Sequence, residues 1–282
     1  MRVPMVSIGL PTFNRPDLLA SVLNNLGSQT FEDFELIISD NASSDPGVRS
    51  LCEGAALLDS RIRYIRQPEN RGALANFWFV HELACSPFFM WAADDDLWPK
   101  DFIARGIAAL NSNSRSDAWF CQMENINSRG QVIRAYPSFN RFTSTSFRSV
   151  DLVKFLWEPE VMGKANLIYS LYRRHTLAPL VRDFRSVEWT WGLDMAFVYA
   201  YLCRHRIVVE DDIVFKKRMD TDNEVHAPIP FPRQYIYPWE EAESYFRSYL
   251  AAARGTRYAV LTAATLRARW MFDVCYHRVR QH

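Results

Sequence analysis

The sequence predicts an α/β protein whose mainly parallel sheet is flanked by helices and followed by a C-terminal helical extension. Short apolar runs alternate with amphipathic segments through the first third of the chain, a pattern typical of parallel sheets covered on both faces. Hydrophobic residues make up 49% of the 282 residues, which is enough for a sizeable core. From Trp239 onward the pattern is helical.

The first two strands and helices follow one another closely. The run MVSIGLP (5–11) is β-like and ends at a proline. Leucines and valines at helical spacing then predict a helix over 15–27. The apolar run FELIISD (34–40) predicts a second buried strand, and a second helix is expected over 44–58.

The same alternation continues to residue 93. RIRYIRQ (61–67) predicts a third strand and GALANFWFVHELA (72–84) a third helix. PFFMWAA (87–93) predicts a fourth strand, which runs straight into three carboxylates. Because strands joined by helices run parallel, we expect their carboxyl ends to meet at one edge of the sheet.

The pattern is less regular after the three carboxylates. We expect helices over 99–111, 149–157 and 193–204. Strands are expected over 117–123, 130–136, 167–174 and 207–218, the last as one strand or two. The four prolines in 228–238 predict a linker. The predicted organisation is a main domain over 1–227, with halves 1–110 and 111–227, and then a linker with a helical extension over 228–282.

Composition and charge argue against several classes of protein. Lys and Arg number 33 and Asp and Glu 32, so the net charge of +1 gives no argument for nucleic-acid binding. The five cysteines are scattered without a CxxC pair, which favours reduced core cysteines in a cytoplasmic protein. No apolar stretch approaches the about 20 residues of a membrane span, and the N-terminus lacks a signal-peptide pattern. We expect a soluble protein, or one that lies at the inner face of a membrane.

Polar residues follow each of the four predicted strands, at the point where ligands bind in open parallel sheets. Four such sets in register are more than turn chemistry alone explains, and we expect them to converge on one site. Three adjacent carboxylates repel one another, so a positive charge is expected beside the last set. The sets are Pro11, Thr12, Asn14 and Arg15; Asp40 and Asn41; Asn70, Arg71 and Gly72; and Asp94, Asp95 and Asp96.

These motifs resemble the N-terminal signature of family 2 glycosyltransferases. In that signature one strand ends in P-x-(Y/F)-N-R and a later strand in D-N-x-S-x-D, which are PTFNR and DNASSD here. NRGALAN at 70–76 and a D-x-D type motif at 94–96 match in the same order. The resemblance is close over 1–110 and weaker up to Arg218. It implies the GT-A fold and transfer of a sugar from a nucleotide-diphosphate donor, with the nucleotide bound by the first half of the main domain and the acceptor by the second.

The resemblance also implies a Mn²⁺ or Mg²⁺ ion between the acidic motif and the donor diphosphate, since hard cations prefer oxygen ligands. We assign Asp94 to the donor ribose and Asp96 to the metal, with Asp95 almost equally favoured and Asp94 as a third candidate ligand. The family's usual form is D-x-D-D, and Ala93 stands at its first aspartate, so the alignment is open by one position. The alternative is an acidic turn that caps the helix starting near Pro99.

The other motif residues are implied to bind the nucleotide. Asp40 matches the aspartate that accepts a hydrogen bond from a uracil or thymine ring, and its alternative role is an Asx turn. Thr12 and Asn14 match the pocket around the base and ribose, or they cap the following helix. Arg71 matches a position that meets the base or the phosphates, or it is a surface arginine. The same motifs include Pro11, Arg15 and Asn41.

An inverting transfer needs a carboxylate that takes the proton from the acceptor hydroxyl as it attacks the anomeric carbon. The family places this aspartate at the start of a helix after a variable loop, and Asp194 in VEWTWGLDMAFVYAYL fits. Glu188 is the second candidate for the base. Trp189 and Trp191 suit stacking on sugar faces or packing in the core. The alternative for Asp194 is an ordinary residue of a first helical turn.

Two later residues and the C-terminal helices have several interpretations. His226 follows the last predicted strand and is a candidate metal ligand, or an exposed loop residue. Arg218 is a candidate for neutralising phosphate. The aromatic and basic helices at the C-terminus would lie on an anionic membrane surface, pack back onto the main domain or mediate homo-oligomer formation.

The sequence thus predicts a metal-dependent inverting glycosyltransferase that uses a UDP- or dTDP-sugar. The expected acceptor is a glycan or a lipid-linked saccharide in surface-polysaccharide synthesis. A nucleotidyltransferase is the enzymatic alternative, but LPTFNRP lacks the glycine-rich phosphate loop expected after its first strand. A catalytically inactive protein that binds nucleotide sugars or glycans is the third hypothesis, and the presence of both the acidic motif and Asp194 argues against it.

Overall fold

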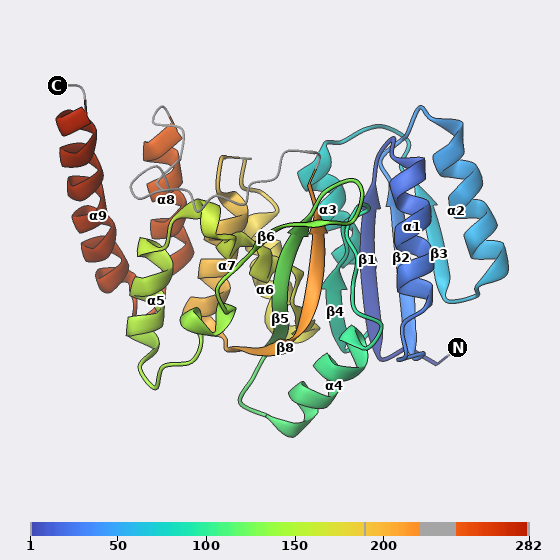
Figure 1. Cartoon of the computed structure of the whole chain (residues 1–282), viewed down its shortest axis with the longest axis horizontal. Coiled ribbons are helices and arrows are strands. Elements are labelled where there is room, and N and C mark those ends of the chain that lie inside the picture. Colours follow the sequence, from blue (N-terminus) through green and yellow to red (C-terminus); the bar gives the residue numbers. More distant parts are fainter. Residues whose placement is uncertain (1, 189, 220–240, 281–282) are drawn as a thin grey trace.

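The computed structural model describes residues 2–188, 190–219 and 241–280, with side chains as far as residue 275. One eight-stranded sheet has the strand order β3-β2-β1-β4-β7-β5-β6, and β8 pairs with β5 (Figure 1). The strands are β1 Val6–Thr12, β2 Phe34–Asp40, β3 Ile62–Arg66, β4 Phe88–Trp91, β5 Ala118–Ile126, β6 Val132–Ala135, β7 Leu171–Arg173 and β8 Ile207–Arg218.

Helices flank the sheet, as the alternating pattern predicts. In Figure 1, α1 and α2 lie at one end of the long axis and α8 and α9 at the other. The α-helices are α1 Pro16–Gly27, α2 Pro46–Leu58, α3 Ala73–Leu83, α4 Phe102–Ser112, α5 Arg148–Trp157, α6 Arg174–Phe184, α7 Leu193–Arg204, α8 Ala242–Ala253 and α9 Ala259–Arg280. Single 3₁₀ turns occur at η1 Phe139–Phe142 and η2 Glu160–Met162, and a longer one at η3 Lys164–Tyr169.

The first four strands form the parallel part of the sheet. β1 is parallel to β2 and to β4, and β2 is parallel to β3. In this register Thr12 stands opposite Asp40, and Asp40 stands opposite Arg66. The sequence-based prediction that the carboxyl ends of these strands meet at one edge is therefore confirmed.

The second half of the sheet is mixed. β7 is antiparallel to β4 and to β5, while β8 is parallel to β5 with one shift of register. The segment 207–218 therefore forms one strand. An isolated bridge pairs Leu97 with Lys216, so the acidic turn that follows β4 lies beside the end of β8.

Two elements differ from the sequence-based prediction. Of the strand predicted over 167–174, only Leu171–Arg173 pairs in the sheet, and the preceding residues belong to η3. No helix is predicted where α6 lies, and Pro179, a residue that disfavours a helix interior, falls inside it. The signal that could have revealed α6 is its apolar residues at helical spacing, which are buried: Leu177, Leu180, Val181 and Phe184.

The described C-terminal helices pack against the main domain. α8 contacts α7 and α9 contacts α5, and Tyr245, Tyr249 and Ala253 of α8 are buried. Packing onto the main domain is thus the interpretation that the structure shows for this part of the chain. Across the described ranges, no helix is both long and apolar enough to cross a bilayer. The linker predicted over 228–238 lies outside the described residues.

Candidate active site

Asparagine side chains fasten the strand ends together at the carboxyl edge of the sheet. Asn76 of α3 accepts a hydrogen bond from Ser39 Oγ at 2.6 Å and donates to the Ser39 carbonyl at 2.9 Å. Asn41 accepts from the backbone N–H of Arg71 at 3.0 Å and donates to Asn70 Oδ1 at 2.8 Å. The loop that follows β3, which contains Asn70 and Arg71, is thereby fixed to the end of β2. Asn76 is the last residue of the NRGALAN motif, and the sequence alone gave no role for it.

The turn after β1 is held in a similar way. Asn14 has φ of +53°, in the left-handed region that asparagine tolerates better than most residues. Its Oδ1 accepts from the backbone N–H groups of Ser44 at 2.8 Å and Asp45 at 3.1 Å. The side chain of Asn14 therefore holds the DNASSD loop and makes no cap bond to α1. Pro11 lies inside β1, opposite Ser39.

Asp40 is completely buried at the end of β2. Its Oδ1 accepts from the backbone N–H of Ser43 at 2.8 Å, and its Oδ2 accepts from the Tyr64 hydroxyl at 3.0 Å. The Arg66 guanidinium lies 3.5 Å from Oδ2. The turn closed by the aspartate side chain, which is the alternative role of Asp40, is therefore present, and the carboxylate has no surface open to a nucleotide base.

The acidic turn after β4 meets the turn after β1. Thr12 Oγ1 donates to Asp94 Oδ2 at 2.8 Å. Arg15 Nη1 lies 2.8 Å from Asp95 Oδ2 and 3.6 Å from Asp94 Oδ1. Burial raises the pKa of Asp94, and the hydrogen bond from Thr12 opposes that rise. The first and last of the predicted strand-end sets are thus in direct contact.

Asp96 is the last carboxylate of this turn, and its side chain is 0% exposed. Its Oδ1 accepts from the backbone N–H of Arg218 at 2.8 Å, and Lys217 Nζ stands 3.7 Å from its Oδ2. Burial raises the pKa of Asp96 to about 6, and the Lys217 charge opposes the rise. Arg15 and Lys217 supply the positive charge that three adjacent carboxylates require.

The donor atoms of the acidic turn fit a divalent cation. At phosphate sites such ions commonly use one or two carboxylates together with phosphate oxygens. Two carboxylates therefore suffice here, although the described part of the chain contains no group of three or more His, Cys, Asp or Glu placed to hold a metal. Asp96 Oδ2 is buried and has no hydrogen-bond partner among the described residues.

Accessibility ranks the three carboxylates as metal ligands. The side chain of Asp95 is 17% exposed, compared with 12% for Asp94 and 0% for Asp96. A cation that also contacts the donor diphosphate must reach its ligand from outside the protein. Asp95 is therefore the most accessible of the three carboxylates, and Asp96, the first assignment from the motif, is the least accessible. The other predicted ligand, His226, lies outside the described residues.

The structure contains a cavity of about 1020 Å³, and none of Asp94, Asp95 and Asp96 lines it. Lys217, which pairs with Asp96, lines this cavity, as does Arg71 of the loop that follows β3. Five aromatic side chains also line the cavity, and aromatic rings provide a flat apolar surface on which a sugar can stack. They are Phe77, Trp78, Tyr136, Tyr169 and Trp191.

Asp194 lines the same cavity from the first turn of α7. The preceding Gly192 has φ of +78°, and a Cβ there would come within 2.7 Å of the Tyr245 ring. Only glycine therefore fits at this entry to α7. Asp194 is exposed where it lines the cavity. Desolvation by the surrounding protein raises the pKa of its carboxyl, and the charge of Lys217 opposes the rise. A cavity carboxylate with a raised pKa suits the role of general base.

The remaining residues predicted for the second half of the domain differ in position. Glu188 is exposed and does not line the cavity, and Trp189 lies outside the described residues. Trp191 lines the cavity and also packs against the Tyr245 ring, with 5.2 Å between ring centroids. Arg218 is engaged by backbone carbonyls, namely those of Asp95, Asn127 and Ser128.

Fold and site together define a class of protein. A mostly parallel sheet flanked by helices, with polar loops at one edge and an acidic turn after the fourth strand, is the architecture of GT-A glycosyltransferases. The family model described as glycosyl transferase family 2 matches residues 7–169, which is more than half of the chain. The chain belongs to this family, and the resemblance of its motifs is thereby confirmed.

Two relatives show how far the similarity extends. A GalNAc(5)-diNAcBac-PP-undecaprenol beta-1,3-glucosyltransferase of Campylobacter jejuni is 34% identical over 95 residues, which cover 33% of this chain and 30% of that enzyme. A PGL/p-HBAD biosynthesis glycosyltransferase of Mycobacterium bovis is 30% identical over 217 residues, which cover 74% of this chain and 76% of the relative. The match to the Campylobacter enzyme therefore spans less than a third of its length.

Solved structures share the fold at low sequence identity. Residues 1–349 of S. aureus TarS superpose with a TM-score of 0.65 at 16% identity, over 93% of this chain and 69% of that one. That protein was also solved in complex with UDP and with UDP-GlcNAc. The mannosyltransferase PcManGT from Pyrobaculum calidifontis, in complex with GDP-Man and Mn²⁺, has a TM-score of 0.54 at 19% identity, over 96% of this chain and 81% of that one.

Proposed function

We propose that this protein is a metal-dependent inverting glycosyltransferase that moves a sugar from a UDP- or dTDP-sugar to a hydroxyl of a glycan or a lipid-linked saccharide. One observation carries the proposal. Lys217 lies 3.7 Å from Asp96 of the acidic turn and lines the cavity that Asp194 also lines. One residue therefore links the acidic turn to the cavity of the candidate base.

The loops at the carboxyl edge would bind the donor. Asp95, supported by Asp94, would hold Mn²⁺ or Mg²⁺, which would act as a Lewis acid on the departing diphosphate. Arg71 and Lys217 line the cavity and add positive charge for the phosphates. The UDP complexes of TarS and the Mn²⁺ complex of PcManGT support a nucleotide donor and a divalent cation.

The cavity would bind the acceptor. Asp194 would take the proton of the acceptor hydroxyl while its oxygen forms a bond to the anomeric carbon. The bond between that carbon and the diphosphate oxygen breaks on the opposite face, and its electron pair leaves with the diphosphate. Attack and departure on opposite faces invert the anomeric configuration. The name of the Campylobacter relative, which includes a saccharide linked to undecaprenol, supports a lipid-linked acceptor.

Nucleotide titration tests the donor assignment. We expect UDP or dTDP to bind measurably in the presence of Mn²⁺ and at least about tenfold more weakly in EDTA, because the ion bridges the diphosphate to the acidic turn. GDP and CDP should bind more weakly than the preferred nucleotide in the same buffer. Isothermal titration of the four nucleotides, each with Mn²⁺ and with EDTA, gives the comparison.

Other results of this titration would change the proposal. Tight binding that persists in EDTA would give the acidic turn a role limited to structure or to the ribose. Absence of binding for all four nucleotides would refute the donor site and would favour the glycan-binding alternative.

The pH dependence of transfer should report the ionisation of Asp194. A general base acts as the carboxylate, so kcat/KM should rise with pH as Asp194 loses its proton. Because burial raises the pKa of Asp194 above the ordinary 3.8, activity should already be falling at a pH above that value. The measurement is kcat/KM between about pH 4 and pH 8, alongside the melting temperature at each pH. An undiminished rate in a folded protein at pH 3.8 would contradict this assignment.

A further inference from the structure

Three cationic side chains line the cavity that Asp194 also lines, namely Arg71, Arg134 and Lys217. Arg71 and Lys217 already have a place in the proposed donor site. Arg134 has none, because it lies on β6, which stands at the opposite end of the sheet order from β3, whereas the donor loops follow strands β1 to β4. The cavity thus contains a guanidinium that the donor site does not use.

The contacts of Arg134 leave its charge unbalanced. Its guanidinium carbon stands 5.1 Å from the centroid of the Tyr136 ring, and its Nη2 donates to Met162 Sδ at 3.9 Å. A thioether sulfur is a weak acceptor, and an aromatic ring carries no net charge. Among the described residues, no carboxylate pairs with Arg134. The side chain is half-buried, so part of its hydration is lost without an opposite charge in return.

Arg141, which lies seven residues further along the chain, shows the contrast. It pairs with Glu158 at 3.0 Å and donates to the backbone carbonyls of Pro137, Ser138 and Met162, and it does not line the cavity. Arg141 therefore uses its donors within the protein. A guanidinium has five N–H donors, and most of those of Arg134 remain for a ligand.

The wall around Arg134 is firmly built. Arg134 stands opposite Asn125 of β5 in the strand register, so the two side chains share one face of the sheet, and both residues line the cavity. Asn125 Nδ2 donates to the Tyr136 hydroxyl at 3.0 Å. The Tyr136 ring also packs on Gly163, where a Cβ would come within 2.7 Å of it. The ring beneath the guanidinium is thereby held in place.

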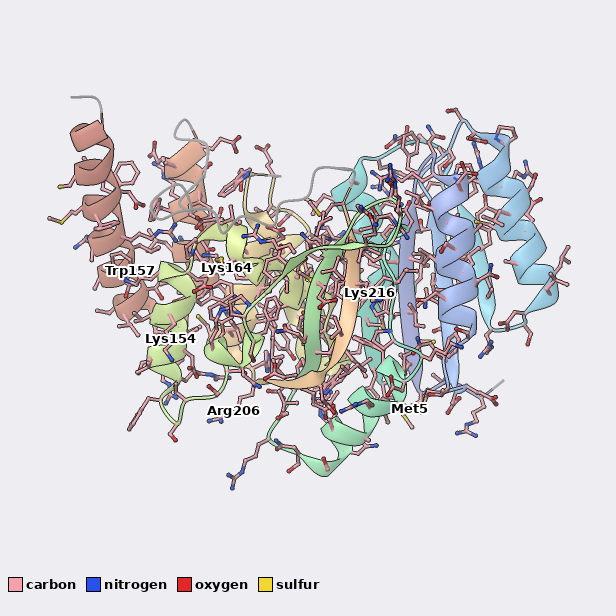
Figure 2. All side chains as sticks on the ribbon, viewed as in Figure 1. Met5, Lys154, Trp157, Lys164, Arg206 and Lys216 are labelled. Atoms are coloured by element: carbon pink, nitrogen blue, oxygen red, sulfur yellow. The ribbon has the colours of Figure 1, made fainter. Side chains whose placement is uncertain are left out.

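The carboxylates of the cavity lining do not offset this positive charge. Glu160 also lines the cavity, but its side chain is 3% exposed and pairs with Arg269 at 2.6 Å and Lys164 at 3.5 Å. Figure 2 shows Lys164 in the half of the molecule that also contains α5, α8 and α9. Among the described residues that line the cavity, Asp194 is the exposed carboxylate. Three accessible cations thus face one accessible anion, which favours a ligand with negative charge.

We propose that Arg134 binds an anionic group of the acceptor, a phosphate or a sugar carboxylate, while a hydroxyl of the same acceptor reaches Asp194. The inference rests on the proposed function and names the class of acceptor, a negatively charged saccharide. A guanidinium presents paired N–H donors that match two oxygens of a phosphate or carboxylate. Asp194 repels the anionic group, so the two charges direct the anion to Arg134 and leave an uncharged hydroxyl for the base.

Titration of simple sugars tests this site without knowledge of the natural acceptor. The anionic probes are glucose 1-phosphate and methyl β-glucuronide, and methyl β-glucoside is their neutral counterpart, with the corresponding galactose series alongside. The full chain is first saturated with its preferred nucleotide and Mn²⁺, so that the donor site is filled. We expect at least one anionic probe to bind the wild type about tenfold or more tightly than its neutral counterpart. Whether the phosphate or the carboxylate series binds identifies the anionic group.

Arg134→Gln should abolish this preference, because glutamine keeps a polar side chain without the charge or the paired donors. Affinity for the neutral probe should stay within about twofold of wild type. Arg129→Gln is the matched control, since Arg129 is an exposed arginine of the turn between β5 and β6 that does not line the cavity. Melting temperatures show whether each variant is folded, and Arg134→Met is the second variant should Arg134→Gln fail to fold.

Several results would overturn the acceptor site. They are equal affinity for the anionic and neutral probes in the wild type, an unchanged preference in folded Arg134→Gln, and an equal loss in Arg129→Gln. Anionic probes that bind only when the nucleotide is absent would belong to the donor site and would overturn it as well. Failure of the nucleotide titration would instead refute the donor site, and the comparison of Arg134→Gln with Arg129→Gln would then be read from the nucleotide-free protein.

Discussion

Asp194→Asn is expected to lower the turnover number for sugar transfer by about 10²–10⁴-fold, the usual contribution of a positioned general base. Asparagine keeps the shape of aspartate, and its amide oxygen can still accept the hydrogen bond from the Met195 backbone that Asp194 accepts at 2.8 Å. It cannot take a proton from the acceptor hydroxyl. Metal-dependent nucleotide binding should stay within about twofold of wild type, because the acidic turn is unchanged.

The measurement is the release of nucleoside diphosphate from the preferred donor in the presence of an acceptor glycoside, with the nucleotide Kd from titration. Asp183→Asn serves as the control, since Asp183 is an exposed carboxylate of α6 that does not line the cavity. Full transfer activity in a folded Asp194→Asn protein would rule out this base. A comparable loss in Glu188→Gln together with activity in Asp194→Asn would move the role to Glu188.

Asp95→Asn is expected to weaken Mn²⁺-dependent nucleotide binding by at least about 10²-fold, because changes to outer-shell partners alone cost ~10–100-fold in metal affinity. The amide is a weaker ligand than the carboxylate and carries no charge to balance the cation. The rate of sugar transfer should fall together with nucleotide binding. Titration of the preferred nucleotide with Mn²⁺ and with EDTA separates loss of the metal contribution from general damage to the site.

Asp96→Asn provides the contrasting variant at the same turn. Asp96 is buried beside Lys217 and accepts from the Arg218 backbone, so its loss should chiefly lower the melting temperature. If folded Asp96→Asn loses Mn²⁺-dependent binding while Asp95→Asn retains it, Asp96 is the ligand, as the motif alone first indicates. Equal metal-dependent affinity in all three proteins, wild type included, would remove both carboxylates from the metal site.

Local patterns were sufficient for most of the fold. Strands β1, β2 and β4 are short apolar runs, and β3 alternates apolar residues with arginine. Helices α1 and α2 each have one apolar face, so period and spacing reveal these elements. Local patterns gave the wrong secondary structure where two local signals conflicted. Pro179 conceals α6, and the apolar residues before Leu171 read as strand although they form η3. Whether such a segment becomes helix or strand depends on the distant residues against which it packs.

The residues of the candidate site were likewise only partly predictable from local patterns. Thr12, Asp40, Arg71 and the acidic turn were recognisable because each lies at or after the end of a strand, so chain order alone places them at one edge. Asp194 was recognisable from the helix in whose first turn it lies. Tyr136 and Tyr169, which also line the cavity, carry no comparable local signal.

By itself, the sequence determined the family, the parallel sheet and the edge where the donor loops meet, because these follow from local periodicity and from motifs of neighbouring residues. The tertiary structure alone decided which carboxylate of the acidic turn is accessible and which is paired with Lys217. It also decided that two C-terminal helices surround Glu160. Burial, charge pairing and unused hydrogen-bond acceptors arise from contacts between distant segments, and no local pattern encodes them.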